Sequence, residues 1–306
     1  MRLAVAATSS VAQPTLDALL EGPHSLVRIF TTADKPSGRG QHLTQSDVAS
    51  WAESHSIECV KVAQSSQMVD LLHDIDCVVT IAFGILLPQE ILDLPTHGFI
   101  NLHFSLLPAW RGAAPVQRAI ENGDELLGIT VFKLDAGMDT GPVYTRASFP
   151  RDPNFRSAEA LDVLSCEGVN LISEALNMIE AGVSPVPQSD NGATRAMKLS
   201  KQESEIQWSS STQRIHQMIS AFYPNPIAFT HFRENVLKIT MSSIPHGLTE
   251  IPALAVGEIF SDKKRVLVGT LDGSLELIKV IPQGKSEMSA IDWARGARLT
   301  PGEICG

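Results

Sequence analysis

The chain has 306 residues, of which 43% are hydrophobic, enough apolar side chain to bury one large core or two smaller ones. Its net charge of −10 argues against a general nucleic-acid-binding protein, whose surface carries an excess of Lys and Arg. The acidic excess lies wholly in residues 1–204, with 14 Lys and Arg against 24 Asp and Glu, whereas residues 205–306 hold 10 of each.

The N-terminal segment MRLAVAATSS becomes polar too early for a signal peptide or a membrane span. The four cysteines are scattered, with no CxxC pair and no His at zinc-ligand spacing; they are Cys59, Cys77, Cys166 and Cys305. We therefore expect a cytoplasmic protein with reduced thiols and no metal.

Short apolar runs alternate with helical patterns through the first 185 or so residues. Buried strands are predicted at 3–7, 26–30, 77–83, 98–104 and 128–134, and helices at 15–20, 47–55, 67–74 and 115–123. This alternation predicts an α/β domain with a doubly wound, Rossmann-like parallel sheet. The active site of such a sheet lies at the carboxyl ends of its strands.

A predicted helix at 157–182 closes this domain, and the pattern then changes. The segment 185–205 is polar and aperiodic, as a linker is. Beyond it, a helix at 211–222 precedes short alternating strands, and Leu271-Asp272-Gly273 is a hairpin signal. These features predict a catalytic domain over 1–187, a linker over 188–205 and an OB-like β-barrel domain over 206–306.

Several common motifs are absent from the sequence. It has no GxGxxG after the first strand, no P-loop, no GxSxG and no HExxH. Asp139-Thr140-Gly141 occurs once, whereas an aspartic protease needs two such carboxylates facing each other.

Asn101 and His103 are two residues apart in the predicted strand 98–104, so they project from the same face near its carboxyl end. An amide can donate to a developing oxyanion, and an imidazole can move a proton near neutral pH. Asp139 follows the next predicted strand and could orient the imidazole or raise its pKa. This set suits attack by an amine on a carbonyl. The alternative is that Asn101 is a turn residue and His103 a core histidine with satisfied hydrogen bonds.

A longer segment surrounds this pair: the run from Ser105 to Pro115 is SLLPAWRGAAP. Together with Asn101-x-His103 and Asp139-Thr140-Gly141, this run resembles the active-site signature of the formyltetrahydrofolate-dependent formyltransferases. Further segments resemble the branch that acts on methionyl-tRNA: DKPSGRG at 34–40, AFGILLP at 82–88, KLSK at 198–201, Ile206-x-Trp208 and Gly284-Lys285. One departure is Ala7-Thr8-Ser9, where the family usually has Gly-Thr-Pro at the first strand–helix turn.

The resemblance implies an enzyme that transfers the formyl group of 10-formyltetrahydrofolate, a co-substrate, to the free α-amino group of initiator methionyl-tRNA in translation initiation. Asn101 would be the oxyanion donor, His103 would handle the proton, and Asp139 would hold His103 and a water. The neutral amine would be the nucleophile, so neither a Ser or Cys nucleophile nor a metal is required. No membrane and no obligate protein partner is implied.

The resemblance also implies binding residues. The folate pocket would be lined by Phe83, Gly84, Ile85, Leu86 and Leu87 and, much of it through the backbone, by Ser105, Leu106, Leu107 and Pro108. The loop of Arg39 would engage the acceptor end of the tRNA, and the C-terminal domain would contact its body, with Lys263, Lys264, Arg265 and Lys285 as candidates.

For some of these side chains the sequence leaves two interpretations open. Arg39 and the cluster Lys263-Lys264-Arg265 could instead be solvated surface charges. Arg111 is either a positive clamp for substrate or a hydrogen-bond buttress of its own loop. Trp110 and Trp208 are expected to be packing residues.

Two other functions are compatible with the catalytic set. The first is a formyltransferase acting on an amino-sugar nucleotide, which would keep Asn101, His103 and Asp139 but lack the tRNA-binding parts. The second is an inactive protein that binds tRNA or folate. The 34–40 loop argues against the former, and the intact catalytic set argues against the latter.

Overall fold

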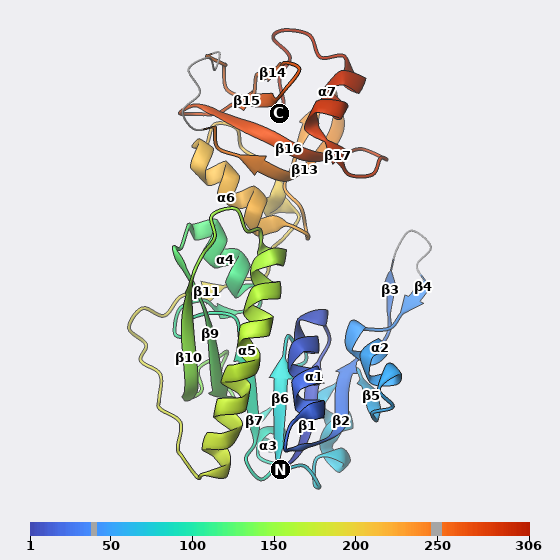
Figure 1. Cartoon of the computed structure of the whole chain (residues 1–306), viewed down its shortest axis with the longest axis vertical. Helices are drawn as coiled ribbons and strands as arrows, with labels where there is room; N and C mark the ends of the chain where they lie inside the picture. The colour runs from blue at the N-terminus through green and yellow to red at the C-terminus, as the bar shows by residue number, and fades with distance from the viewer. Residues whose placement is uncertain (38–41, 246–252) are drawn as a thin grey trace. The chain divides into compact units, whose positions relative to one another are not determined.

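The computed structural model describes residues 1–37, 42–245 and 253–306 (Figure 1). The chain forms two compact units. The first comprises Met1–Pro115, Leu126–Pro150 and Leu161–Ala196, and the second comprises Val116–Glu125, Arg151–Ala160 and Met197–Gly306. The domain boundaries at 187/188 and 205/206 stay predictions.

A seven-stranded sheet organises the first unit, in the order β10-β9-β7-β6-β1-β2-β5. Its strands are β1 (Arg2–Ala7), β2 (Ser25–Thr32), β5 (Cys59–Val62), β6 (Cys77–Ile81), β7 (Phe99–His103), β9 (Leu126–Lys133) and β10 (Val143–Pro150). The first five are mutually parallel, whereas β9 is antiparallel to β7 and β10 is antiparallel to β9. The predicted Rossmann-like α/β fold is confirmed. The expectation that every strand is parallel is wrong for β9, because a buried apolar run has the same pattern in either direction.

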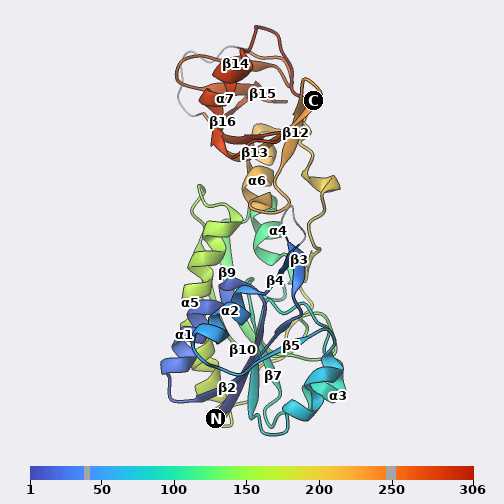
Figure 2. The same cartoon turned by 90° about the vertical axis from the view of Figure 1, so that its right-hand side faces the viewer.

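Helices cover both faces of this sheet (Figure 2). On one side lie α1 (Gln13–Glu21), α2 (Asp47–Ser54) and α5 (Ser157–Glu180), and on the other lies α3 (Gln89–Leu92). The segment predicted as a helix at 67–74 is the 3-10 helix η2 (Ser65–Leu71), which packs with α3. A Cβ at Gly168 in α5 would lie 2.8 Å from Leu102 Cδ2, so this helix closely approaches the face of β7 that Leu102 occupies.

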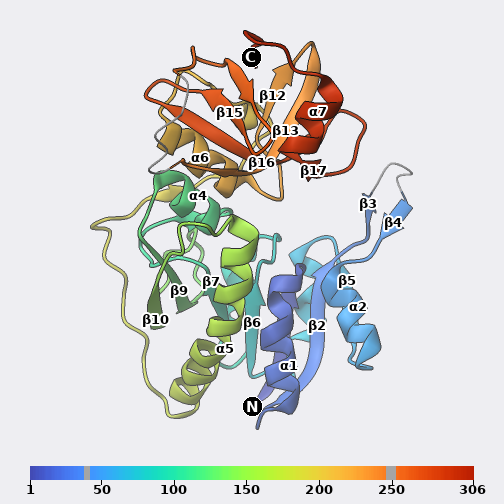
Figure 3. The same cartoon turned by 45° about the horizontal axis from the view of Figure 1, so that its top comes forward.

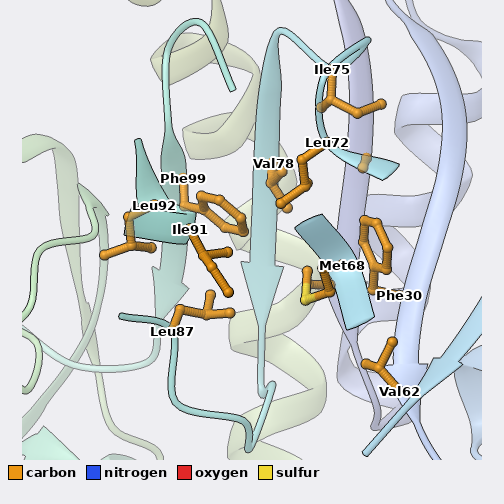
Figure 4. Close-up of a cluster of buried hydrophobic side chains, with 12 residues drawn as sticks. Phe30, Val62, Met68, Leu72, Ile75, Val78, Leu87, Ile91, Leu92 and Phe99 are labelled. Carbon is orange, nitrogen blue, oxygen red and sulfur yellow. The ribbon is translucent and has the colours of Figure 1, made fainter. Parts of the chain in front are cut away.

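The opposite face of β7 joins a hydrophobic cluster (Figure 4). Its members include Met68 from η2 and Leu72 directly after it, Ile91 and Leu92 from α3, and Phe30, Val78 and Phe99 from the strands. Each fully buried Leu or Phe contributes about 1.5–3 kcal/mol of transfer free energy. Since Phe99 shares its strand face with Asn101 and His103, this burial fixes which face of the sheet carries the candidate site.

The remaining elements of the chain are short. They are η1 (Ser10–Ala12), β3 (Lys35–Ser37), β4 (His42–Thr44), β8 (Arg111–Gly112), α4 (Pro115–Asn122), β11 (Arg195–Ala196) and η3 (Gln202–Ser204). Strand β3 pairs with β4, and β8 pairs in parallel with β11. None of Ala7, Thr8 and Ser9 has a positive φ, so the turn after β1 does not require the glycine usual in the family.

The second unit contains a curled antiparallel sheet in the order β12-β13-β16-β15-β14, with β17 paired to β16 (Figure 3). Its strands are β12 (Phe229–Phe232), β13 (Asn235–Ser243), β14 (Ile259–Ser261), β15 (Val266–Gly269), β16 (Ser274–Pro282) and β17 (Met288–Ser289). Helix α6 (Thr212–Phe222) packs on β13, and α7 (Ala290–Ala297) packs on β15 and β16. In the described part of the chain β12 and β14 are edges, so the OB-like domain is a half-barrel. The predicted hairpin at 271–273 joins β15 to β16.

Across the described ranges, no helix is both long enough and apolar enough to cross a membrane.

Candidate active site

Asn101 lies in the middle of β7, where the neighbouring strand β6 orients its side chain. Thr80 of β6 is opposite Asn101 in the register, and its hydroxyl donates a shared hydrogen bond to Asn101 Oδ1 at 2.9 Å and to Ile100 O at 3.0 Å. Among the residues that the structure describes, no partner is found for Asn101 Nδ2. Because Oδ1 is engaged by Thr80, the amide is held with its N–H donor available at a cavity that Asn101 lines.

His103 ends β7 and is only 5% exposed. Its Nε2 lies 3.0 Å from the carbonyl oxygen of Trp110, which can only accept a hydrogen bond, so Nε2 carries the proton. The ring of Phe132 packs edge-on against the imidazole. Burial lowers the pKa of His103 below its ordinary value of 6.5, although the Asp139 carboxylate and the Trp110 carbonyl both oppose that shift. The neutral ring therefore presents its lone pair on Nδ1.

Asp139 faces this nitrogen. Its Oδ2 lies 3.8 Å from His103 Nδ1 and accepts a hydrogen bond of 2.7 Å from the backbone N–H of Gly112. Asp139 was expected near His103 because it follows the next strand of a sheet predicted to be parallel. That reason is wrong, because β9 runs antiparallel to β7 and the carboxyl end of β9 lies beside Ile100. The loop after β9 returns Asp139 to the other end of β7.

The return depends on a tight turn over residues 135–141. Asp135 Oδ1 accepts from Gly137 N at 3.0 Å and from Thr140 Oγ1 at 2.7 Å. Asp139 itself has a φ of +53°, which is uncommon for a residue with a Cβ. A Cβ at Gly141 would collide with the Lys133 carbonyl, so only glycine fits there. The Asp-Thr-Gly motif is thus a turn that places one carboxylate, and it is not half of a protease dyad.

Two cavities, of about 500 Å³ and about 330 Å³, meet at this group of side chains. Both are lined by Asn101 and Asp139 together with Phe83, Ile85, Leu86 and Met138, and His103 and Gly84 line the larger one. Leu86 is 79% exposed and Met138 is 65% exposed, so the rim is apolar. An apolar cleft with a few convergent polar groups suits a largely flat organic ligand.

The loop of residues 83–87, which forms one wall of these cavities, packs against the hydrophobic cluster. Leu87 is buried in the cluster of Figure 4 and lines the smaller cavity, while Phe83 and Ile85 pack against that same cluster. The structure thus brings the five predicted folate residues from Phe83 to Leu87 together with Asn101.

The other predicted folate segment, from Ser105 to Pro108, does not line either of these two cavities. Ser105 and Leu107 are buried, and Ser105 Oγ donates to Ala109 O at 2.7 Å. Thr130 Oγ1 donates to Ser105 O at 2.7 Å and accepts from Leu107 N at 3.2 Å. These bonds fix the start of the loop that carries Trp110. Direct contact between this segment and folate stays a prediction.

Arg111 is a buttress in this structure. Its Nε and Nη2 donate to Gln188 Oε1 at 3.3 and 2.9 Å, and its Nη1 pairs with Asp190 at 3.1 Å. Neither Thr80 nor Gln188 was among the residues predicted from the sequence. A threonine inside a buried strand opposite a polar residue could have indicated the first, whereas nothing in the aperiodic segment 185–205 indicated the second.

The candidate tRNA residues lie in several places. Arg39 is outside the described residues. Lys263, Lys264 and Lys285 are exposed in turns. The backbone N–H groups of Lys264 and Arg265 donate to Asp262 Oδ1 and lower the pKa of that carboxyl, and Arg265 Nε lies 3.3 Å from Asp262 Oδ2. Asp262 thus accepts the hydrogen bonds that hold this turn. The role of these candidate residues in binding stays a prediction.

Chemically, the site joins a fixed amide donor, a neutral imidazole and a carboxylate in a largely apolar cleft. It can stabilise a tetrahedral oxyanion and move a proton. Within residues 1–37, 42–245 and 253–306, no group of three or more His, Cys, Asp and Glu side chains could hold a metal ion.

Comparison with known proteins covers both units. Residues 1–176 match the family described as formyl transferase, and residues 198–298 match the formyl transferase C-terminal domain. The chain is 40% identical over 309 residues to the methionyl-tRNA formyltransferase of Salinispora tropica, covering 99% of both chains. It is 40% identical over 312 residues to that of Streptomyces coelicolor, covering 100% of both.

Solved structures with the same fold include an N-formyltransferase from Helicobacter canadensis, in complex with folinic acid and dTDP-3-aminofucose. The TM-score is 0.69 at 17% identity, covering 90% of this chain and 98% of that one. The methionyl-tRNA formyltransferase of Clostridium thermocellum has a TM-score of 0.59 at 18% identity, covering 81% of this chain and 95% of that one. At such identities these likenesses show the fold alone.

Proposed function

Because the chain belongs to the formyl transferase family, we propose that it transfers the formyl group of 10-formyltetrahydrofolate to the α-amino group of methionine esterified to initiator tRNA. The observation that carries this proposal is the 40% identity across both units to relatives named methionyl-tRNA formyltransferase. The structural similarity to an enzyme solved with an amino-sugar nucleotide is weaker evidence about the substrate, since the two sequences are only 17% identical.

The reaction exchanges one C–N bond for another. The neutral amine attacks the formyl carbon, a new N–C bond forms, and the carbonyl oxygen becomes an oxyanion. The intermediate then breaks its bond to N10 of the folate, which leaves as tetrahydrofolate. The amine nitrogen loses one proton and N10 gains one, so no oxidant, metal or protein nucleophile is needed to balance the step.

Different side chains stabilise the charges that form in this reaction and transfer the proton. Asn101 Nδ2, held by Thr80, donates to the oxyanion as it forms. His103 accepts the amine proton at Nδ1, because Nε2–H is committed to Trp110, and then supplies that proton toward N10. Asp139, 3.8 Å from Nδ1, stabilises the imidazolium between the two transfers.

The apolar cleft provides the binding surface. Phe83, Ile85, Leu86 and Met138 would pack against the pterin ring of the co-substrate and exclude water from the reacting groups. Where Ser105, Leu106, Leu107 and Pro108 contact it, the buried side chains of Ser105 and Leu107 leave the backbone as the contacting surface. We assign the acceptor stem to the loop of Arg39 and the tRNA body to Lys263, Lys264, Arg265 and Lys285. We infer from action on initiator tRNA that the protein works in the cytoplasm.

A test of the acceptor distinguishes the proposal from its rivals. The full chain is incubated with formyl-labelled 10-formyltetrahydrofolate and one of three acceptors: methionyl initiator tRNA, the same tRNA without methionine, or a dTDP-linked amino sugar. We expect label on the charged tRNA alone, released with the amino acid by mild base. Label on the amino sugar instead would overturn the assignment, and label on neither would favour a binding protein without activity.

A further inference from the structure

The segment from Gln188 to Ala196, here called the return segment, follows α5 and passes back beside the catalytic residues. We propose that Gln188 is a positioning residue for the reaction, because it holds the turn that presents Asp139 to His103. The inference rests on the proposed function for its kinetic consequence, but its structural consequence can be measured without substrate.

The amide of Gln188 connects two loops. Its Nε2 donates to the carbonyl oxygens of Asp139 at 3.0 Å and of Gly141 at 2.7 Å. Its Oε1 accepts from Nε and Nη2 of Arg111 at 3.3 and 2.9 Å. Both N–H groups and both lone pairs of the amide are therefore used, so Gln188 has no capacity left for a substrate and acts through its neighbours.

The hydrogen bonds from Gln188 to the Asp139 and Gly141 carbonyls stabilise the turn at its least favourable backbone conformation. Asp139 has a left-handed backbone, which a residue with a side chain adopts only when its surroundings hold it there. The two carbonyls on either side of Thr140 are fixed by a single NH₂ group. Releasing them would let the turn relax and carry the carboxylate away from His103 Nδ1.

The rest of the return segment holds the opposite wall of the site. Thr194 Oγ1 accepts from Trp110 N at 2.8 Å, and Thr194 O accepts from Arg111 N at 2.9 Å. Strand β11 pairs with β8, and a Cβ at Gly112 would lie 2.6 Å from Ala196 O. Trp110 O is the partner of His103 Nε2, and Gly112 N is the partner of Asp139 Oδ2. The same segment thus fixes the partners of both catalytic side chains.

Two substitutions at Gln188 test the donor side of its amide. Gln188→Glu keeps an acceptor for Arg111 but replaces the donor with an oxygen that faces two carbonyls. Gln188→Met keeps the length and removes both sides. Asp190→Ala is the control, because Asp190 pairs with the same arginine but its side chain is 93% exposed. We expect kcat to fall about 10- to 100-fold for Gln188→Glu and Gln188→Met, with KM for the folate within about twofold, and little change for Asp190→Ala.

The second readout is the titration of the His103 ring, followed by NMR in the full chain without substrate. Because the Asp139 carboxylate raises the pKa of His103, its retreat should lower that pKa further in Gln188→Met, which adds no charge of its own. A shifted titration in a chain that formylates no acceptor would support the positioning role while contradicting the proposed function. Wild-type kcat together with a wild-type titration in Gln188→Met would overturn the inference. If Gln188→Met fails to fold, kcat of Gln188→Glu decides, and a wild-type value there would overturn the inference as well.

Discussion

The Nδ1 atom of His103 lies 3.8 Å from Oδ2 of Asp139, and the side chains carrying these atoms are only 6% and 13% exposed. This separation is too long for a hydrogen bond, yet the Coulombic interaction is strong in a site shielded from water. The neutral imidazole therefore keeps its Nδ1 lone pair, while the carboxylate stands ready to stabilise the cation formed when that nitrogen takes a proton. Several consequences of this arrangement can be measured.

Asp139→Asn should reduce turnover by about 100-fold or more. The amide preserves the shape of the carboxylate and can still accept from Gly112 N, but it carries no charge to stabilise the imidazolium. Its NH₂ can also donate to Nδ1 and occupy the lone pair. Steady-state kcat with saturating charged tRNA measures the effect, and Asp93→Asn, an exposed acid at the end of α3, is the matched control. A kcat within about twofold of wild type would remove Asp139 from the mechanism.

Asn101→Ala should cost about 3–4 kcal/mol of transition-state stabilisation if its amide is the main oxyanion donor. Thr80→Val should cost about 1–2 kcal/mol, because it removes only the hydroxyl that orients the amide. Both costs follow from kcat/KM, with Asn122→Ala as a control at an exposed position. If Thr80→Val is silent while Asn101→Ala is not, the strand itself suffices to orient the amide.

The pH dependence should show two ionisations on the acid side. The substrate amine, with a pKa of about 7.7–8.0, and His103 must both be unprotonated. Burial lowers the pKa of His103 below 6.5, so its neutral, active form persists to lower pH than an ordinary histidine would allow. The logarithm of kcat/KM for charged tRNA should fall with slope 1 below about pH 7.7 and approach slope 2 only below about pH 6.5. A slope of 2 already present at pH 7 would contradict the lowered pKa.

Binding of tRNA should weaken with salt, but only moderately. If Arg39, Lys263, Lys264, Arg265 and Lys285 neutralise three to five phosphates between them, the log–log slope should be about −2 to −4. Lys264→Ala should make the slope shallower by about 1, whereas Arg2→Ala, which removes an arginine paired with Asp74, should not change it. A slope near zero would favour a substrate other than tRNA. A slope steeper than about −6 would require a basic surface that this acidic chain lacks.

The sequence predicted the fold class because burial and periodicity are local properties. The runs around 3–7, 77–83 and 98–104 became β1, β6 and β7, and the i, i+2 spacing of Asn101 and His103 put both on one face of β7. The direction of β9 could not be predicted in this way, since it depends on which end of the strands the chain enters from after α4.

The hydrogen bonds that support the site could not be predicted from the sequence for a different reason. Gln188 reaches Asp139 across 49 positions of sequence, and its segment is polar and aperiodic, so no pattern marks it. Arg111 could be interpreted as a substrate clamp or as a buttress of its loop, and only its hydrogen bonds to Gln188 decide between the two. Long-range polar contacts of this kind depend on the folded backbone and leave little trace in local composition.

The most direct test of the mechanism is a single-turnover reaction. The full chain is loaded with labelled 10-formyltetrahydrofolate, mixed with methionyl initiator tRNA, and quenched on the millisecond-to-minute scale. In the wild type, formyl-methionyl-tRNA and tetrahydrofolate should appear together with one rate constant. His103→Ala should slow that constant by about 100- to 10,000-fold while leaving folate binding intact, because the proton moves only during reaction. The control His231→Ala, in β12, should match the wild type. Transfer by His103→Ala at less than about a fivefold deficit would contradict the account.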